Sequence, residues 1–341
     1  MTKRLTKSLK RADIEKLMKS VTSSGALFIA PISEGGYVSY KPVTGIDEVV
    51  FDYIIPTKSF KEFLFPQTES VARFTIGQHT VDVEPVEPDA TERVIFGSRP
   101  CDAASVASLR SVATWDYVDE YYTKREDAAT VITVACSTGD ESCFCTAVEL
   151  KPDTREGSDI MLLETEGEAY IVEALTSKGE HFIEKHADIF TDDKPAKALP
   201  IFEPEKLDGV DLKKISSFLK DTSHYENPMW QELASKCFGC GSCTYACPTC
   251  HCFDITDEGT AYEGERKKNW DACQFDSFTL HAGGHNPRDA QYKRWRNRFM
   301  CKFHIYPEKF ETKGCVGCGR CIRVCPVRLD ITEVMEAISN K

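Results

Sequence analysis

The alternation of apolar and polar residues over the first 190 positions predicts a mixed α/β region. Apolar residues at near-helical spacing between Leu5 and Val21 indicate an amphipathic first helix. Short alternating stretches then predict strands, because Gly, Pro and Asp cluster in the turns between them. The predicted elements are strands over residues 25–31, 36–40, 71–76, 81–83 and 93–97 and a short helix over 58–65.

A strand, a loop and a helix follow one another next and predict a βαβ unit. The strand at 93–97 leads into a helix over 103–113 with Asp102 as its N-cap, and another strand spans 131–136. The remaining elements predicted for this region are a hairpin of residues 161–166 and 169–174, which turns at Gly167, and a helix over 177–190.

A segment rich in proline and charge divides the chain. Residues 191–206 hold three prolines and mixed charges, which indicates a linker between domain 1–190 and domain 207–341. The predicted fold class is α+β, with an N-terminal mixed α/β domain followed by an elaborated α-helical, ferredoxin-like bicluster domain. Helices in the second domain are predicted over residues 212–219, 228–235 and 331–338.

Two copies of one cysteine motif dominate the second domain. The sequence Cys-x2-Cys-x2-Cys-x3-Cys-Pro begins at Cys237 and again at Cys315. It is the ferredoxin spacing for a [4Fe–4S] cluster, in which three thiolates of one loop bind one cubane and the fourth cysteine binds the other. The predicted ligands are Cys237, Cys240, Cys243 and Cys325 for one cluster, and Cys315, Cys318, Cys321 and Cys247 for the second.

Structural zinc is the alternative for these residues, since four thiolates at Cys-x2-Cys spacing also bind zinc. Zinc sites usually contain two Cys-x2-Cys pairs that lie a dozen or more residues apart. Three cysteines at two-residue gaps followed by Cys-Pro match that pattern poorly. The spacing therefore favours iron–sulfur clusters.

Eight further cysteines form two groups. The first lies in loops near the ends of predicted strands, where neighbouring loops converge, so we expect a third metal site and most simply a third [4Fe–4S] cluster. Its alternative is burial of cysteine as a small apolar side chain. The second group lies among the 67 residues between the two motifs and either binds a fourth cluster or shields the first. The first group is Cys101, Cys136, Cys143 and Cys145, and the second is Cys250, Cys252, Cys273 and Cys301.

The segment between the motifs also contains a histidine loop and a basic run. His281 and His285 flank a Gly-Gly pair, and a structural role is favoured over metal ligation there. The basic residues from Lys293 to Lys302 are expected on a solvated or partner-docking helix face.

Composition restricts the possible functions. The net charge of −12 and the pI near 5.3 argue against nucleic-acid binding. The first residues contain no apolar signal segment and no apolar run is long enough to span a bilayer, so we expect a cytoplasmic protein with reduced thiols. The sequence contains no nucleotide-binding fingerprint and no catalytic motif, which predicts no flavin or nucleotide in this chain and no catalytic residue.

Several stretches together resemble one protein family. They are similar to the iron–sulfur beta subunit of soluble NiFe hydrogenases (sulfhydrogenases) and to the closely related iron–sulfur subunit of anaerobic sulfite reductases. The resemblance runs from about residue 55 to the C-terminus, and the Cys-His-Cys-Phe-Asp-Ile stretch favours the hydrogenase type. The stretches that carry it are residues 63–69, 97–103, 143–146, 237–255, 270–273 and 281–288 and the motif at Cys315.

The resemblance implies an electron-transfer protein that works in a multisubunit complex. One partner would be a reductase that binds flavin and NAD(P). The other would be a catalytic subunit, either a NiFe hydrogenase or a sirohaem sulfite reductase. Two other functions stay open: a catalytic reductase that uses a cluster with an open iron, and a metal-stabilised adaptor without redox function.

Overall fold

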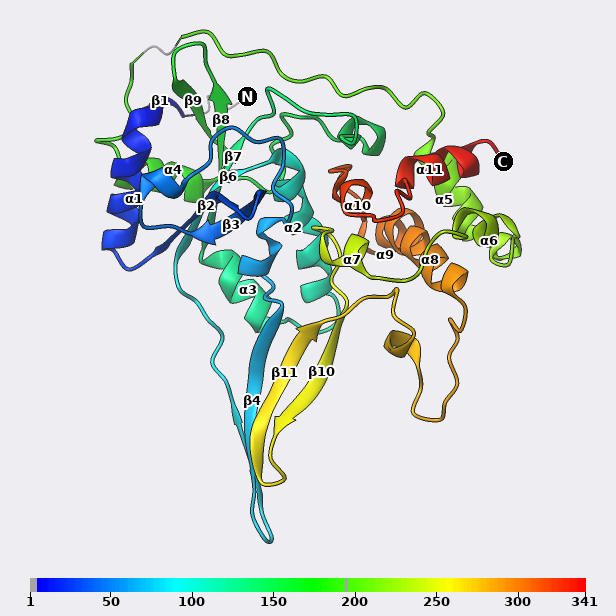
Figure 1. Ribbon diagram of the computed structural model, residues 1–341. Coiled ribbons are helices and arrows are strands. Elements are labelled where there is room, and N and C mark those ends of the chain that lie inside the picture. Colours follow the sequence, from blue (N-terminus) through cyan, green and yellow to red (C-terminus); the bar gives the residue numbers. More distant parts are fainter. Residues whose placement is uncertain (1–4, 194–195) are drawn as a thin grey trace.

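The larger of two β-sheets forms the N-terminal part of the computed structural model, which describes residues 5–193 and 196–341 (Figure 1). Within these residues its seven strands run in the order β1-β9-β8-β7-β6-β2-β3. The pairs of β2 with β6, β6 with β7 and β7 with β8 are parallel, and the outer pairs are antiparallel. The strands are β1 (Thr6–Lys10), β2 (Leu27–Glu34), β3 (Tyr37–Pro42), β6 (Arg93–Ser98), β7 (Ala129–Val134), β8 (Ile160–Glu164) and β9 (Ala169–Ala174).

Helices cover both faces of this sheet. Successive side chains of each strand point to opposite faces, so each face has its own core. Phe28 belongs to the core under α1 (Ile14–Ser23) and α4 (Ser177–Lys185), whereas its neighbour Ile29 belongs to the core under α2 (Pro100–Ala113) and α3 (Glu120–Asp127). The predicted βαβ unit is confirmed, since β6 and β7 pair in parallel and α2 connects them. The predicted hairpin is confirmed as β8 and β9.

The predicted first helix is wrong over its first half. Residues 6–10 form β1, which pairs antiparallel with β9, and α1 begins only at Ile14. Leu9 is buried in this strand, and an apolar residue at this position fits a buried helix face as well as a buried strand face. Pairing with β9 gives the backbone of this segment its hydrogen bonds, and only the tertiary structure supplies that partner.

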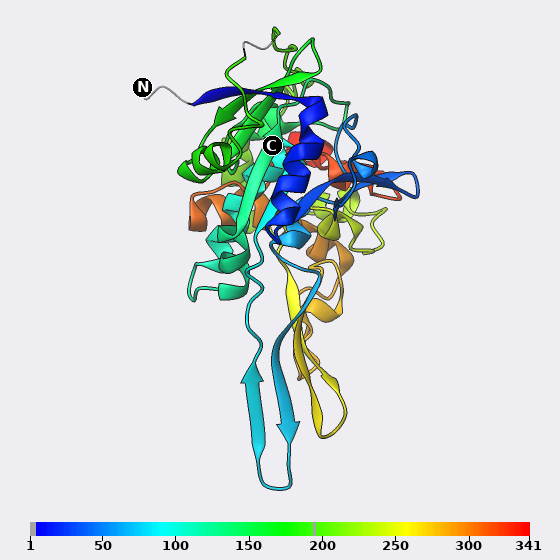
Figure 2. The same ribbon diagram turned by 90° about the vertical axis from the view of Figure 1, so that its left-hand side faces the viewer.

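The smaller sheet extends away from the body as a long arm (Figures 1 and 2). Its described strands run in the order β10-β11-β4-β5. The hairpin of β10 and β11 was not predicted, and it pairs with β4, so this sheet combines segments from both sides of residues 191–206. The strands are β4 (Thr68–Ile76), β5 (Val81–Pro85), β10 (Phe253–Gly259) and β11 (Glu263–Trp270).

The helices of the C-terminal part pack around their own core. Trp230, Phe299 and Met335 are fully buried there, together with Phe144 and Val148 from the N-terminal part. Lys194 and Pro195 of the predicted linker lie outside the described residues. None of the described helices has the length and apolar character needed to cross a membrane. The main helices here are α5 (Leu212–Lys220), α6 (Met229–Leu233), α8 (Gln291–Met300), α9 (Tyr306–Phe310) and α11 (Ile331–Ser339).

A buried ion pair connects the two parts. The prediction that Asp102 is the N-cap of α2 is wrong. The helix begins at Pro100, two residues before Asp102, and its N-cap is Arg99. Instead, the Arg320 guanidinium donates two hydrogen bonds to the Asp102 carboxylate, one of them at 2.8 Å, and a third at 2.8 Å to the Pro56 carbonyl. The side chains of Asp102 and Arg320 are 0% and 1% exposed.

Removing one partner of this pair should destabilise the protein strongly. In D102A the Arg320 charge stays buried without its carboxylate, so we expect the free energy of unfolding to fall by about 3–5 kcal/mol. Anaerobic denaturant titration of the full chain measures it. The control is E308A, which breaks the exposed Lys220–Glu308 pair and should change the free energy by less than about 1 kcal/mol. Equal effects of the two variants would contradict the proposed importance of the buried pair.

Candidate metal centres

Both cysteine motifs fold as a tight loop that runs into one helical turn. The two glycines of each motif have left-handed backbone angles, from φ +62° at Gly317 to φ +75° at Gly241, which glycine adopts without steric cost. The loops lead into α7 (Ser242–Tyr245) and α10 (Arg320–Arg323), and these two helices contact one another. The sequence repeat is therefore also a structural repeat whose two copies lie side by side.

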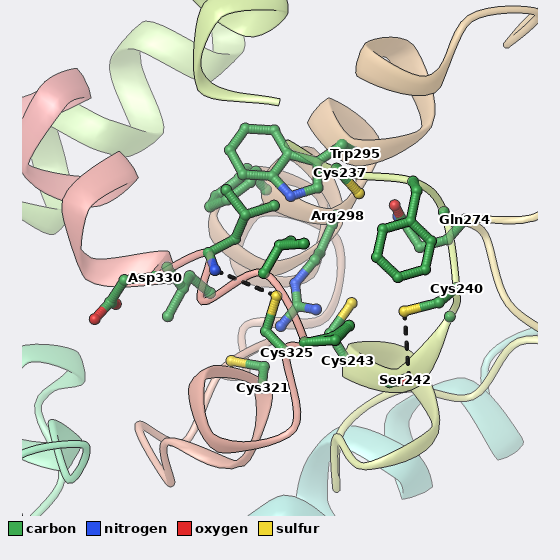
Figure 3. A pocket seen from close by; sticks show the side chains of 18 residues that line it. Cys237, Cys240, Ser242, Cys243, Gln274, Trp295, Arg298, Cys321, Cys325 and Asp330 are labelled. Atoms are coloured by element: carbon green, nitrogen blue, oxygen red, sulfur yellow. Dashed lines mark hydrogen bonds between the residues drawn. The ribbon is translucent and has the colours of Figure 1, made fainter. Parts of the chain in front are cut away.

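Set 1 consists of Cys237, Cys240, Cys243 and Cys325, and all four line one cavity (Figure 3). Three of these cysteines come from the first motif and the fourth from the end of the second. The Leu329 backbone N–H donates a hydrogen bond to Cys325 Sγ at 3.2 Å, and the Gln291 amide donates one to Cys237 Sγ at 3.4 Å. Hydrogen bonds to cysteine sulfurs raise or lower the reduction potential of a bound cluster.

Set 2 consists of Cys315, Cys318, Cys321 and Cys247 and lies deeper. Burial raises the pKa of the Cys315 thiol to about 11 and that of Cys321 to about 12, and Cys247 adds to both shifts through its proximity. The Cys247 sulfur lies 3.2 Å from Lys302 Nζ. Thiols bind metal as thiolates, so an ammonium group at this distance stabilises the metal-bound form.

Set 3 consists of Cys101, Cys136, Cys143 and Cys145, and the structure brings these four side chains to one cavity. Cys101 lies in the first turn of α2 and Cys136 follows β7, so both come from the carboxyl ends of neighbouring parallel strands, as the sequence predicted. The Arg323 guanidinium donates a hydrogen bond to Cys143 Sγ at 3.4 Å.

Set 4 consists of Cys250, Cys252, Cys273 and Cys301, which also share a cavity. Cys250 and Cys252 precede β10, Cys273 follows β11, and Cys301 follows α8. These four residues therefore lie together in the fold, as binding of one further cluster, one of the two alternatives for this group, requires.

Set 2 adjoins each of the other three sets. Its Cys321 also lines the set 1 cavity, and its Cys318 lines the set 3 cavity. Lys302 Nζ lies 3.2 Å from Cys247 Sγ of set 2 and 3.7 Å from Cys250 Sγ of set 4. The four sets therefore form one continuous region in which set 2 is central.

The basic run from Lys293 to Lys302 does not lie wholly on a solvated or partner-docking face, as the sequence predicted, because three of its charged side chains are buried. Arg296, Arg298 and Lys302 are each 5% exposed or less. Arg298 lies near the thiols of sets 1, 2 and 4, and Figure 3 shows its guanidinium among the sulfurs of the set 1 cavity. No carboxylate in the described ranges forms an ion pair with Arg298 or Lys302. Their charges are instead placed to balance thiolates, a role that only the folded chain reveals.

Known proteins resemble this chain in the region that contains both cysteine motifs. Residues 236–329 match the family model of a 4Fe-4S dicluster domain, which contains both motifs. The chain is also 32% identical over 317 residues to sulfhydrogenase 2 subunit beta of Pyrococcus furiosus, covering 90% of this chain and 91% of that protein. The chain belongs to the sulfhydrogenase beta-subunit family. It is therefore an iron–sulfur protein of electron transfer, and the hydrogenase-type resemblance seen in the sequence is confirmed.

The donor groups of this beta-subunit family member fit [4Fe–4S] clusters. Each set offers four thiols, the number of ligands that one cubane takes. Within residues 5–193 and 196–341, no three His, Cys, Asp or Glu side chains converge tightly enough to hold a single bare ion. The four thiolates that bind a cubane lie farther apart than the ligands of a single ion, because each thiolate binds a different iron. The His281 and His285 rings lie 5.5 Å apart on an exposed loop and line none of the cavities of sets 1, 3 and 4.

Sequence reasoning missed Lys61, which contributes to the surroundings of sets 2 and 4. Its Nζ donates hydrogen bonds to the carbonyls of Cys247 and Cys250 at 3.1 and 2.9 Å. Burial lowers its pKa to about 8, while the nearby cysteines act in the opposite direction. No local signal identifies this lysine, since 186 residues separate it from Cys247.

Close packing between sets 2 and 3 can be tested at Gly317. A Cβ at this position would lie 2.4 Å from the Cys145 Cα, and φ is +62°. We expect G317A to lose iron from both sets, because the loop must move away from Cys145. The control G283A adds a Cβ with no atom within 4 Å and should keep its iron. Iron and acid-labile sulfide per chain are the measurement, and equal contents in the two variants would contradict the tight contact.

Proposed function

We propose that this protein relays electrons within a multisubunit hydrogenase through clusters bound at sets 1, 2 and 3. One end of the relay would receive electrons from, or deliver them to, a hydrogenase catalytic subunit. The other end would serve a flavin- and NAD(P)-binding subunit. The name of the Pyrococcus furiosus relative, a sulfhydrogenase subunit, supports this assignment because it describes one part of a larger enzyme.

The observation that carries the proposal is the continuity of the thiol sets. Cys321 borders set 1 and Cys318 borders set 3, so set 2 has cysteines in contact with the surroundings of both. Each cluster accepts one electron and passes one on, and the relay returns to its starting state. Oxidation of one H₂ to two protons at the catalytic subunit would supply two such electrons.

Both ends of this series reach the protein surface. Cys240 of set 1 is exposed, and the adjacent Phe238 is 63% exposed. At set 3, Ile54 lines the cavity and is 37% exposed. Set 2 lies between them, where Cys247 and Cys318 are buried and Cys315 and Cys321 are partly exposed. A relay needs this arrangement, with two accessible ends and a protected middle.

The relay can be interrupted at set 1, one of its two ends. We expect C240A to lose the cluster of set 1 and to abolish electron transfer from H₂ to NAD(P)⁺ in the assembled complex. The catalytic subunit should still reduce an artificial dye directly. The control S235A changes an exposed side chain of the same segment and should leave both activities unchanged. Normal NAD(P)⁺ reduction by C240A would refute the relay.

The third cluster has its own test. In C143S we expect the iron content to fall by about four per chain, because one cubane loses a ligand. Iron, acid-labile sulfide and zinc are measured together on anaerobically purified protein. An unchanged iron content would mean that the cysteines of set 3 are only buried apolar side chains. The loss of a single zinc would mean that set 3 binds zinc and not a cluster.

A further inference from the structure

The cavity of set 4 lies beyond the three sets used above. Its four cysteines come from three separate segments of the chain, yet all face a space of about 320 Å³. Buried cysteines that serve only as small apolar side chains have no reason to converge. Three polar side chains, those of His251, Arg298 and Lys302, also line this space.

Positive charge concentrates at this cavity. Lys302 Nζ lies 3.7 Å from Cys250 Sγ, and Lys61 Nζ donates to the Cys250 carbonyl at 2.9 Å. Lys61, Arg298 and Lys302 are each 5% exposed or less. In the described part of the chain none of the three pairs with a carboxylate. Because an isolated charge is costly to bury, three buried cations around these thiols favour an anionic, thiolate-ligated group.

The backbone at Cys301 is unusual in a way that agrees with a built site. Residues Cys301–Ile305 form a π-helical turn directly after α8. Such turns are rare and often occur at functional sites. This turn places the Cys301 thiol and Lys302 Nζ at the same cavity. The Tyr306 hydroxyl, one residue beyond the turn, lies 2.6 Å from Nδ1 of His251, so that nitrogen already has a partner.

We propose that Cys250, Cys252, Cys273 and Cys301 bind a fourth [4Fe–4S] cluster, next to the second ferredoxin-type cluster. Every one of the sixteen cysteines of the chain then belongs to a set of four. Binding replaces the protons of the four thiols with four iron–sulfur bonds. Lys302 Nζ lies 3.2 Å from Cys247 Sγ and 3.7 Å from Cys250 Sγ, which places this cluster beside set 2. Its use in electron transfer rests on the relay proposed above.

Iron counting on full-length, anaerobically purified variants tests the site. We expect C301S and C252S each to lose about four irons and the same amount of sulfide. The double variant C252S/C301S should lose no more than either single variant, because both residues bind one cluster. Adding C143S to C301S should double the loss, since that cysteine belongs to set 3. The control S277A, an exposed residue of the same segment, should keep its iron.

Three outcomes would overturn the fourth cluster: an unchanged iron content in C252S and C301S, the loss of one zinc, or losses that add up in the double variant. If these serine variants fail to fold, the unsubstituted chain and C143S decide together. About sixteen irons in the unsubstituted chain support the proposal, whereas about twelve that fall to about eight in C143S refute it. The relay is judged separately by C240A and NAD(P)⁺ reduction. Failure of the fourth site would leave that result unaffected.

Discussion

Burying many metal-binding thiols in one chain requires positive charge in the interior of the protein. Lys61, Arg298 and Lys302 provide it, and all three lie beside the cysteine sets. An unpaired ion costs several kcal/mol to bury, so these residues and the thiolate-bound clusters stabilise one another. The same cations raise or lower the potential of the clusters, because electrostatic surroundings are one of the levers a protein has on an iron–sulfur centre.

The fold brings these charges and thiols together by joining the two parts of the chain. The Arg320–Asp102 pair fixes the second cysteine motif against the first turn of α2, which also carries Cys101. The Phe144 N–H donates to the Gly317 carbonyl at 2.9 Å and adds a backbone contact at the same place. A shared core and the shared arm sheet extend this contact. Sets 2 and 3 therefore depend on the interface between the two parts.

A central set with three neighbours suits an electron-transfer protein. Electrons move quickly only between centres that lie close together, and contact between ligands of adjoining sets provides that closeness. Set 2 has no fully exposed cysteine, whereas set 1 includes the exposed Cys240. Exchange with partner proteins would thus occur at the outer sets, and the protein around set 2 would exclude water from the middle of the series.

The sequence alone determined the parts of this protein that depend on neighbouring residues. The two ferredoxin-type motifs are local, because three cysteines and two glycines within seven residues define each loop. The βαβ unit and the hairpin of β8 and β9 follow from local periodicity in the same way. The eight cysteines outside these motifs were recognised as two groups. The first group was expected to converge at the strand ends, whereas the second could not be placed in space from the sequence.

Only the tertiary structure decided what depends on distant partners. Residues 6–10 form a strand because their backbone forms hydrogen bonds with β9. The tertiary structure buried Arg298 and Lys302, which the sequence predicted on a solvated face, because thiols from several sets surround them. It pairs Asp102 with Arg320, which lies 218 residues away in the sequence. It also gathered Cys250, Cys252, Cys273 and Cys301 from three segments, since the β10–β11 hairpin and α8 bring their ends to one cavity, and no local pattern encodes that convergence.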